Sequence, residues 1–223
     1  MKKPRLLDLF CGAGGAAKGY QRAGFYVVGV DNKPQPHYCG DEFYQSDALT
    51  FPLEGYDAYH ASPPCQLYSL ASVVHRNRGA IYPDLIAATR FRLCLNDKPF
   101  VIENVPPAAK FLVKPITLCG TMFGLGVFRH RLFESTFVIQ IPEHHKHHGK
   151  IGDGEYFSVA GGSGRWKSWG TVFRNVSKGT REQWRLAMGI DWMLRSELTQ
   201  AIPPAYTEYI GGYLMKVIRG IAV

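Results

Sequence analysis

The sequence lacks any long uninterrupted run of apolar residues, which excludes the commonest kind of membrane-spanning segment. A helix that crosses a bilayer needs about 20 predominantly apolar residues in a row, and no segment of the 223 residues approaches that length. The charged start, Met1 to Leu7, is cut short by Asp8 and by glycines, so it lacks the roughly 7 to 15 apolar residues of a secretory signal. We therefore expect a cytoplasmic protein with no membrane partner.

Cysteines, repeats and acidic residues are also scarce. Five cysteines, an odd number without regular spacing, do not form the pattern of a disulfide framework. No internal repeat or low-complexity tract is evident. The 18 Asp and Glu residues are outnumbered by 26 Lys and Arg, which leaves a formal net charge of +8. This surplus favours a polyanionic partner such as nucleic acid, although on charge alone a basic protein without such a partner is the alternative.

Short apolar runs bounded by Gly, Pro and Asp are typical of buried strands joined by turns. Such runs cover residues 5–10, 26–31, 42–47, 57–62 and 99–105. Helical spacing is found over residues 15–23, 84–96 and 182–188 and in the last stretch to Ile218. Strands that alternate with helices predict an α/β sheet with crossover helices, and the length suits one domain with an insertion.

The first predicted strand runs into a glycine-rich turn, Asp8-Leu9-Phe10-Cys11-Gly12-Ala13-Gly14-Gly15. Glycine lets the backbone approach a ligand closely, and ligands of such sheets lie at the carboxyl ends of strands. The spacing is not the dinucleotide pattern G-x-G-x-x-G, so a plain tight turn is the alternative. Asp31 and Asp47 close the next two strands, where they could accept hydrogen bonds from ribose hydroxyls and an exocyclic amine. Solvated turn acids are their alternative interpretation.

Cys65 follows two prolines in Ala61-Ser62-Pro63-Pro64-Cys65-Gln66. The prolines restrict the backbone where the fourth strand ends and so fix the direction of the thiol. A cysteine attacks only as its thiolate, which needs an electropositive and partly exposed site. Most cysteines of reduced proteins instead fill apolar space. We interpret four of the five in that way: Cys11, Cys39, Cys94 and Cys119.

Glu103 ends the fifth predicted strand, directly before Asn104. A solvated strand-end acid is its simplest interpretation, but nucleophilic attack on a flat, electron-poor ring needs an acid that shares a proton with the ring. Arg129 and Arg131 are one residue apart, so in an extended segment they point to opposite faces. One could reach a site while the other braces neighbouring structure or a phosphate. Surface residues of an edge strand are the alternative.

Taken in order, these motifs resemble those of the cytosine-C5 DNA methyltransferase family. The matching segments are Asp8 to Gly15, Val30-Asp31, Ser46-Asp47, Ser62-Pro63-Pro64-Cys65-Gln66, Glu103-Asn104-Val105, Arg129-His130-Arg131 and Ala201-Ile202-Pro203-Pro204. Their order and approximate spacing match over nearly the whole chain apart from residues 135–180. The combination of Pro-Cys-Gln with Glu-Asn-Val is the most specific part.

The resemblance implies a Rossmann-like sheet of the S-adenosylmethionine-dependent methyltransferases. Residues 1–134 and 181–223 would form the catalytic and cofactor-binding domain, and residues 135–180 a small target-recognition insertion. It also implies S-adenosylmethionine as cofactor and DNA, double-stranded in the simplest case, as the partner of a monomer. The residues implied at the cofactor are Phe10, Cys11, Gly12, Ala13, Gly14, Gly15, Asp31, Asn32, Asp47, Ala48 and Pro63.

For the chemistry, the resemblance implies that Cys65 attacks C6 of a cytosine flipped out of the duplex while Glu103 engages N3. Arg131 would lie beside the target base, with Arg129 as a helper. The activated C5 then takes the methyl group before elimination releases the enzyme. Flipping is required because a stacked ring exposes neither face. Residues 66–81 would form a lid over the DNA backbone.

Two features depart from the family pattern. The insertion is much shorter than the usual recognition region, so we expect short or loose sequence readout. Thr199-Gln200 stands where a Gly-Asn pair is usual, which leaves the matching cofactor contact open. The alternatives are the same chemistry on RNA and a catalytically silent nucleic-acid-binding relative. The target sequence, and the choice between a restriction-modification partner and a stand-alone modifier, are not predicted.

Two groups within the insertion have no assigned role. His144, His145, His147 and His148 lack the cysteine or acid framework of a metal site in the nearby sequence, so we interpret them as an exposed loop that could touch phosphate, with no metal. Trp166 and Trp169 are expected either to form a small core of the insertion or to stack on bases.

Overall fold

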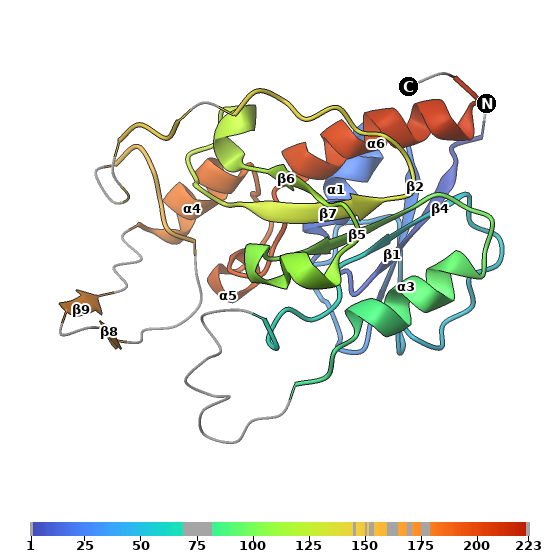
Figure 1. Cartoon of the computed structure of the whole chain (residues 1–223), viewed down its shortest axis with the longest axis horizontal. Helices are drawn as coiled ribbons and strands as arrows, with labels where there is room; N and C mark the ends of the chain where they lie inside the picture. The colour runs from blue at the N-terminus through green and yellow to red at the C-terminus, as the bar shows by residue number, and fades with distance from the viewer. Residues whose placement is uncertain are drawn as a thin grey trace.

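The computed structural model describes residues 2–68, 82–144, 146–149, 151, 154–159 and 179–221, together with the backbone of residues 165–168 and 171–174. Its centre is a seven-stranded sheet (Figure 1). In sheet order the strands are β3 (Glu42–Gln45), β2 (Tyr26–Asp31), β1 (Arg5–Leu9), β4 (Ala58–Ala61), β5 (Phe100–Asn104), β7 (Arg131–Ser135) and β6 (Ile116–Leu118).

Strands β1 to β5 run parallel, so their carboxyl ends meet at one edge of the sheet. All five lie within the apolar runs expected from the sequence, which confirms the α/β prediction. Strand β7 runs antiparallel to both of its neighbours, β5 and β6. Because β7 begins at Arg131, the Arg129-His130-Arg131 motif enters the sheet beside Glu103, which pairs in register with Phe133.

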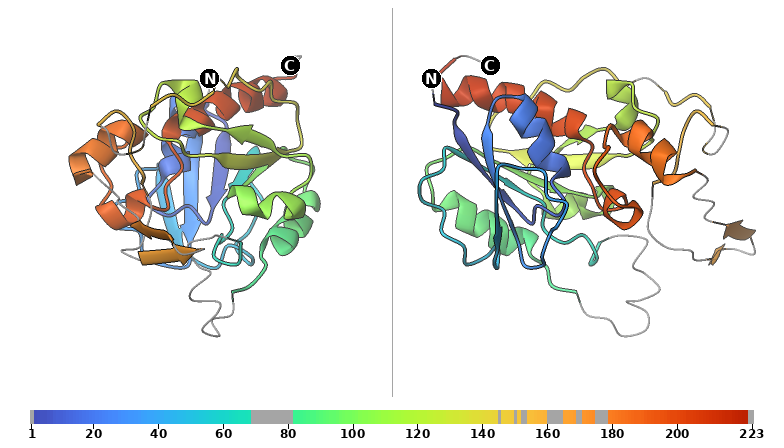
Figure 2. Two further views of the ribbon diagram at one scale, coloured as in Figure 1. Left: turned by 60° about the vertical axis from the view of Figure 1, so that its left-hand side comes forward. Right: turned by 180° about the vertical axis from the view of Figure 1, so that it is seen from behind.

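Helices cover both faces of the sheet (Figure 2). Helices α1 (Gly15–Arg22) and α6 (Pro204–Ile218) pack on one face, and α3 (Ile86–Cys94) packs on the other. Within β1, Leu6 belongs to the α1/α6 core and Leu7 to the α3 core, as the two-residue alternation of a strand requires. Both faces are therefore buried, which explains why the strands read as continuous apolar runs.

Helices α1 and α6 approach closely because α1 carries glycine at the contact. A Cβ atom on Gly19 would overlap the carbonyl oxygen of Pro204 and the hydroxyl of Thr207. Thr207 Oγ1 uses this proximity to donate to the Ala16 carbonyl at 2.9 Å. The first helix after the glycine turn is thus fixed to the last helix of the chain.

The remaining elements surround the carboxyl edge of the sheet. They are the 3-10 helices η2 (Pro106–Phe111) and η3 (Gly120–Phe123), helices α4 (Arg181–Met188) and α5 (Arg195–Leu198), and the separate hairpin of β8 (Arg165–Ser168) and β9 (Thr171–Arg174). Helix α4 begins with a capping box, in which Thr180 Oγ1 accepts from the Gln183 amide at 3.2 Å. Its Trp184 and Met188 form a third buried cluster with Ala13 of the glycine turn.

Several expectations fall outside the described residues: most of the lid, at residues 69–81, together with Trp169 and the side chain of Trp166. Among the residues that are described, no helix has both the length and the apolar character needed to cross a membrane.

Candidate active site

Polar side chains replace apolar ones where the strands near the α1/α6 face reach the carboxyl edge. Asp8, His60 and Glu103 each stand two residues after an apolar residue of the α1/α6 core, so they share its face. Asp8 pairs in register with His60, which pairs with Val101, two residues before Glu103. All three ionisable side chains are buried. Buried polar groups at this edge are the first structural sign of a site.

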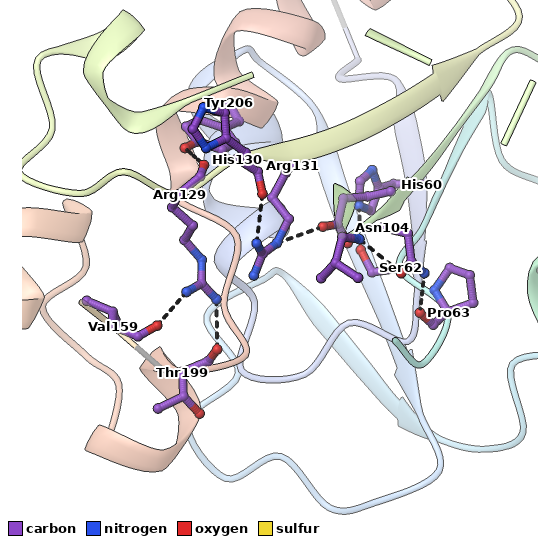
Figure 3. A network of polar contacts seen from close by, with 12 residues as sticks. His60, Ser62, Pro63, Asn104, Arg129, His130, Arg131, Val159, Thr199 and Tyr206 are labelled. Carbon is purple, nitrogen blue, oxygen red and sulfur yellow. Dashed lines mark hydrogen bonds and ion pairs between the residues drawn. The ribbon is translucent and has the colours of Figure 1, made fainter. Parts of the chain in front are cut away.

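A chain of hydrogen bonds connects α1 to Glu103. Tyr20 Oη lies 3.0 Å from His60 Nδ1, and His60 Nε2 lies 3.0 Å from Ser62 Oγ; Figure 3 shows His60 and Ser62. Ser62 also hydrogen-bonds to Glu103, which lowers the pKa of that carboxyl. Burial lowers the pKa of His60 to about 3, so its ring is neutral at pH 7.

Neutral histidine has one donor and one acceptor nitrogen, which fixes the direction of this chain. When Glu103 is ionised, Ser62 donates its single proton to that carboxylate. Its oxygen then accepts from His60 Nε2–H, which leaves Nδ1 to accept from Tyr20. Every donor in the chain therefore points towards Glu103.

Glu103 forms an ion pair with Arg131, whose Nε lies 3.1 Å from Glu103 Oε1. Burial raises the pKa of Glu103, and the charges of Arg131 and Arg129 together with the Ser62 hydrogen bond oppose that rise. Arg131 Nη1 also donates to the carbonyl oxygen of His130 at 2.9 Å, which orients its guanidinium (Figure 3). The carboxyl thus takes up a proton more readily than an exposed glutamate does, yet keeps a cation beside it.

Asn104 holds the loop that carries Cys65. Its Nδ2 donates to the Pro63 carbonyl at 2.9 Å, and its Oδ1 accepts from the Val105 amide at 2.9 Å (Figure 3). Cys65 is partly buried. Burial and the charge of Glu103 raise the pKa of its thiol, whereas Arg131 and Arg129 lower it. The Glu-Asn pair of β5 therefore sets both the position and the charge environment of the cysteine.

One cavity of about 580 Å³ joins the glycine turn to Cys65. Its wall includes Cys65, Glu103 and Arg131 of the expected catalytic residues. Of the residues expected at the cofactor, it includes Phe10, Cys11, Gly12, Ala13, Gly15, Asp31, Asn32, Asp47, Ala48 and Pro63. Gly14 and Arg129 are not part of the wall. Thr199 and Gln200, which stand where Gly-Asn is usual in the resembled family, do line it.

The glycine turn has the backbone of a ligand cradle. Phe10 adopts φ 59°, a conformation that non-glycine residues seldom take up and that is found at functional sites. The Gly12 amide donates to Asp31 Oδ2 at 3.0 Å, and the Lys33 amide donates to Asp31 Oδ1 at 3.0 Å. On the far side, Trp192 Nε1 donates to the Ala13 carbonyl at 2.8 Å. These bonds fix the turn and place the Asp31 carboxylate at the cavity.

Asp8 is a cavity residue that opens the glycine-turn motif but was given no role from the sequence. It is fully buried, and neither carboxylate oxygen has a hydrogen-bond partner within the described protein. Burial, with the charges of Asp31 and Glu103, raises its pKa well above the ordinary value. A buried acceptor without a protein partner at a cavity wall indicates that a ligand or water supplies the missing hydrogen bond. A charged residue between Leu7 and Leu9 in an apolar strand was the signal that could have identified it.

Arg129 braces the wall from behind. Its Nη1 donates to the Val159 carbonyl at 2.7 Å and its Nη2 to the Thr199 carbonyl at 2.8 Å (Figure 3). Burial lowers the pKa of Arg129 to about 9. The two arginines therefore divide as their spacing allowed: Arg131 lines the cavity, and Arg129 joins the 135–180 segment to the 199–202 part of the wall.

Comparison with known proteins was made on sequence and on structure. No protein-family model matches the chain. Type II methyltransferase M1.HphI of Haemophilus parahaemolyticus is 28% identical over 121 residues, covering 44% of this chain and 32% of that protein. The chain thus aligns with about a third of the length of that relative.

Solved structures align over almost the whole chain. An E. coli prophage-encoded protein described as a DNA modification methyltransferase aligns over 97% of this chain and 100% of its own with a TM-score of 0.63 and 15% identity. The Entamoeba histolytica methyltransferase EhMeth aligns over 98% of this chain and 99% of its own, with a TM-score of 0.62 and 13% identity. The S. pombe Dnmt2 methyltransferase aligns over 97% of this chain and 99% of its own, with a TM-score of 0.60 and 14% identity. At these identities the likeness shows the fold alone, which is the α/β fold of these methyltransferase structures.

Proposed function

We propose that the protein is a DNA cytosine-C5 methyltransferase that uses S-adenosylmethionine and a covalent bond between Cys65 and C6 of a flipped cytosine. The observation that carries the proposal is a single cavity whose wall contains Cys65, Glu103 and Arg131 at one end and the glycine turn at the other. The partial match to a type II methyltransferase supports methyl transfer as the reaction class. The net charge of +8 supports a polyanionic substrate.

The cofactor end of the cavity suits a nucleoside with a charged tail. Asp31 closes β2 and presents carboxylate oxygens to ribose hydroxyls, and Asp47 with Ala48 follows β3 at the edge where the adenine would lie. Phe10 and Pro63 supply apolar surface, and Asp8 supplies a buried acceptor without a protein partner. S-adenosylmethionine supplies an electrophilic methyl group when it is bound.

At the other end, Cys65 forms the bond to C6 as its thiolate, and the electron pair of the C5–C6 double bond moves to C5 and is delocalised towards N3. Glu103 shares a proton with N3 and so stabilises the developing charge. Its raised pKa favours the protonated form that this step needs. Once C5 had gained the methyl group, a water molecule would accept the C5 proton and the electron pair of the C5–H bond would re-form the C5–C6 double bond. The S–C6 bond would break at the same time, and its electrons would restore the thiolate.

Methyl transfer to three substrates tests this function directly. With radiolabelled S-adenosylmethionine we expect incorporation into duplex DNA, and 5-methylcytosine as the product in digested DNA. Duplexes that carry 5-fluorocytosine should trap a protein–DNA adduct, because fluorine at C5 cannot leave as a proton does. Labelling of transfer RNA in place of DNA would favour the RNA alternative. No labelling of either would favour a catalytically silent nucleic-acid-binding protein.

A Cys65→Ala substitution tests the nucleophile. We expect a loss of activity of at least about 10³-fold, since removing a covalent nucleophile removes the main route to the product. Cys94→Ala is the matched control, because Cys94 is an exposed cysteine at the end of α3; it should keep full activity. A Cys65→Ala protein that methylates DNA at the normal rate would refute the covalent mechanism.

A further inference from the structure

Four potential metal ligands from three segments of the chain meet beside β7. Cys119 precedes η3, His130 precedes β7, and His144 and His147 lie in the histidine-rich stretch. Their ligand atoms all lie within 4.8 Å of one another. Cys119 Sγ is 3.3 Å from His147 Nε2, which is 2.9 Å from His144 Nε2. In the spacing Cys-x10-His-x13-His-x2-His only His144 and His147 form a short pair, and Cys119 and His130 are distant in sequence, so the nearby sequence did not reveal the cluster.

We propose that Cys119, His130, His144 and His147 bind one zinc ion in a closed tetrahedral site. One thiolate and three imidazoles form a donor set that suits zinc. With bonds of about 2.0–2.3 Å, the ligand atoms of a tetrahedral zinc site lie about 3.3–3.8 Å apart. The two measured separations and the 4.8 Å limit bracket this range, so movements of about an ångström would complete the site.

The surroundings of the cluster are also compatible with a metal site. Phe128 stacks on the His147 ring, with 4.2 Å between centroids and 7° between planes. The Thr121 hydroxyl donates to Cys119 Sγ at 3.4 Å, as supporting residues do around a thiolate ligand. Cys119 is completely buried.

The zinc site would have a structural role. Its four positions are filled by protein, which leaves none open for a substrate. The ion would join the turn after β6, the start of β7 and the 144–147 stretch at the beginning of the insertion. His130 lies between Arg129 and Arg131, and its carbonyl accepts from Arg131. Zinc binding would therefore fix the backbone from which Arg131 reaches Glu103, and it does not depend on the proposed methyl transfer.

Metal content of the purified full-length chain is the first test. We expect about one zinc per chain by elemental analysis. Replacement by Co²⁺ should give the intense visible absorption of tetrahedral Co²⁺ together with a thiolate-to-cobalt charge-transfer band. A metal-free chain that binds neither ion, or a cobalt spectrum without the charge-transfer band, would overturn the proposal.

Variants locate the ion. Cys119→Ser should lose the charge-transfer band, and the double variant His144→Asn, His147→Asn should lose stoichiometric zinc. The double variant should fold normally, because His144 is exposed and His147 is only partly buried. His148→Asn is the matched control, since this exposed neighbour lies outside the cluster; it should retain zinc. Zinc retained equally by all variants would place the ion elsewhere and refute this site.

Chelation gives an independent measurement. A strong chelator should lower the melting temperature of the wild-type chain and of His148→Asn, and leave that of the double variant unchanged. Equal responses from the three proteins would contradict zinc bound by these histidines.

Discussion

At the residue scale, opposing influences act on the pKa of Glu103. Burial raises the pKa of its carboxyl, while Arg131 and the hydrogen bond from Ser62 lower it. Through Ser62 the carboxyl is connected to His60, which burial keeps neutral. The chain of donors from Tyr20 therefore delivers hydrogen bonds to Glu103 without adding a charge. Such an arrangement lets one carboxyl hold a proton near a substrate ring and remain anchored when it ionises.

The same charges control Cys65, and this can be measured without any substrate. Glu103 raises the pKa of the Cys65 thiol and Arg131 lowers it. At the alkaline pH where thiols titrate, Glu103 is ionised, so Glu103→Gln removes a negative charge that disfavours the thiolate. We expect the pH midpoint for alkylation of Cys65 to fall by about one unit or more in Glu103→Gln and to rise in Arg131→Met.

To measure these midpoints, the folded protein is alkylated briefly with iodoacetamide at each pH of a series. Mass spectrometry then gives the extent of alkylation of each cysteine-containing peptide. Cys94 serves as an internal control because it is exposed and outside the cavity; its profile should be the same in all three proteins. Shifts in the same direction for both variants would show that charge does not set the reactivity of Cys65.

At the scale of elements, the position of the glycine turn depends on how closely α1 packs against α6. Gly19 and Gly212 both lie inside helices, but only Gly19 faces a neighbouring backbone, whereas a Cβ on Gly212 would meet nothing within 4 Å. Replacing glycine by alanine gains up to about 1 kcal/mol of helix propensity at either position. At Gly19 the clash with Pro204 and Thr207 outweighs this gain and costs about 1–3 kcal/mol.

We therefore expect Gly19→Ala to lower the free energy of unfolding and Gly212→Ala to raise it. Urea denaturation followed by circular dichroism gives both values under the same conditions. Similar stabilisation by the two substitutions would mean that α1 can move away from α6 without cost.

The sequence predicts an element when the residues that stabilise it are close in sequence, and fails to predict it when they are distant. Strands β1 to β5 were predictable because local apolar runs suffice to bury both faces of a parallel sheet. Strand β7 was not, because its buried Glu134 breaks the apolar pattern. Arg90, 44 residues earlier, compensates this charge with two contacts of 2.6 Å to Glu134. The apolar pattern of residues 131–135 alone cannot predict an ion pair with a residue so distant in sequence.

The same limit applied at the site. Cys65, Glu103 and most of the turn were identified from local motifs, and the structure places them around one cavity. Asp8 was quoted only as the start of the glycine-turn motif and His60 was not considered, because each sits in an apolar strand and only the sheet register makes them neighbours. Cys119 was interpreted as a buried filler; it is buried, but three histidines from other segments lie beside it.

For the whole molecule, the surplus of basic residues predicts how binding to DNA depends on salt. Each phosphate neutralised by Lys or Arg contributes a slope of about −0.9 to the logarithm of the binding constant against the logarithm of the salt concentration. If half of the net charge of +8 engages phosphates, the slope is about −3.6, and affinity falls roughly 150-fold between 50 and 200 mM salt.

Fluorescence anisotropy with a labelled duplex measures this slope. Binding of S-adenosylhomocysteine, a small ligand that we propose binds in the cavity, is the control and should change little over the same range. A slope near zero for DNA would mean that the positive charge does not contribute to nucleic-acid binding. The net charge would then no longer support the proposal of a polyanionic substrate.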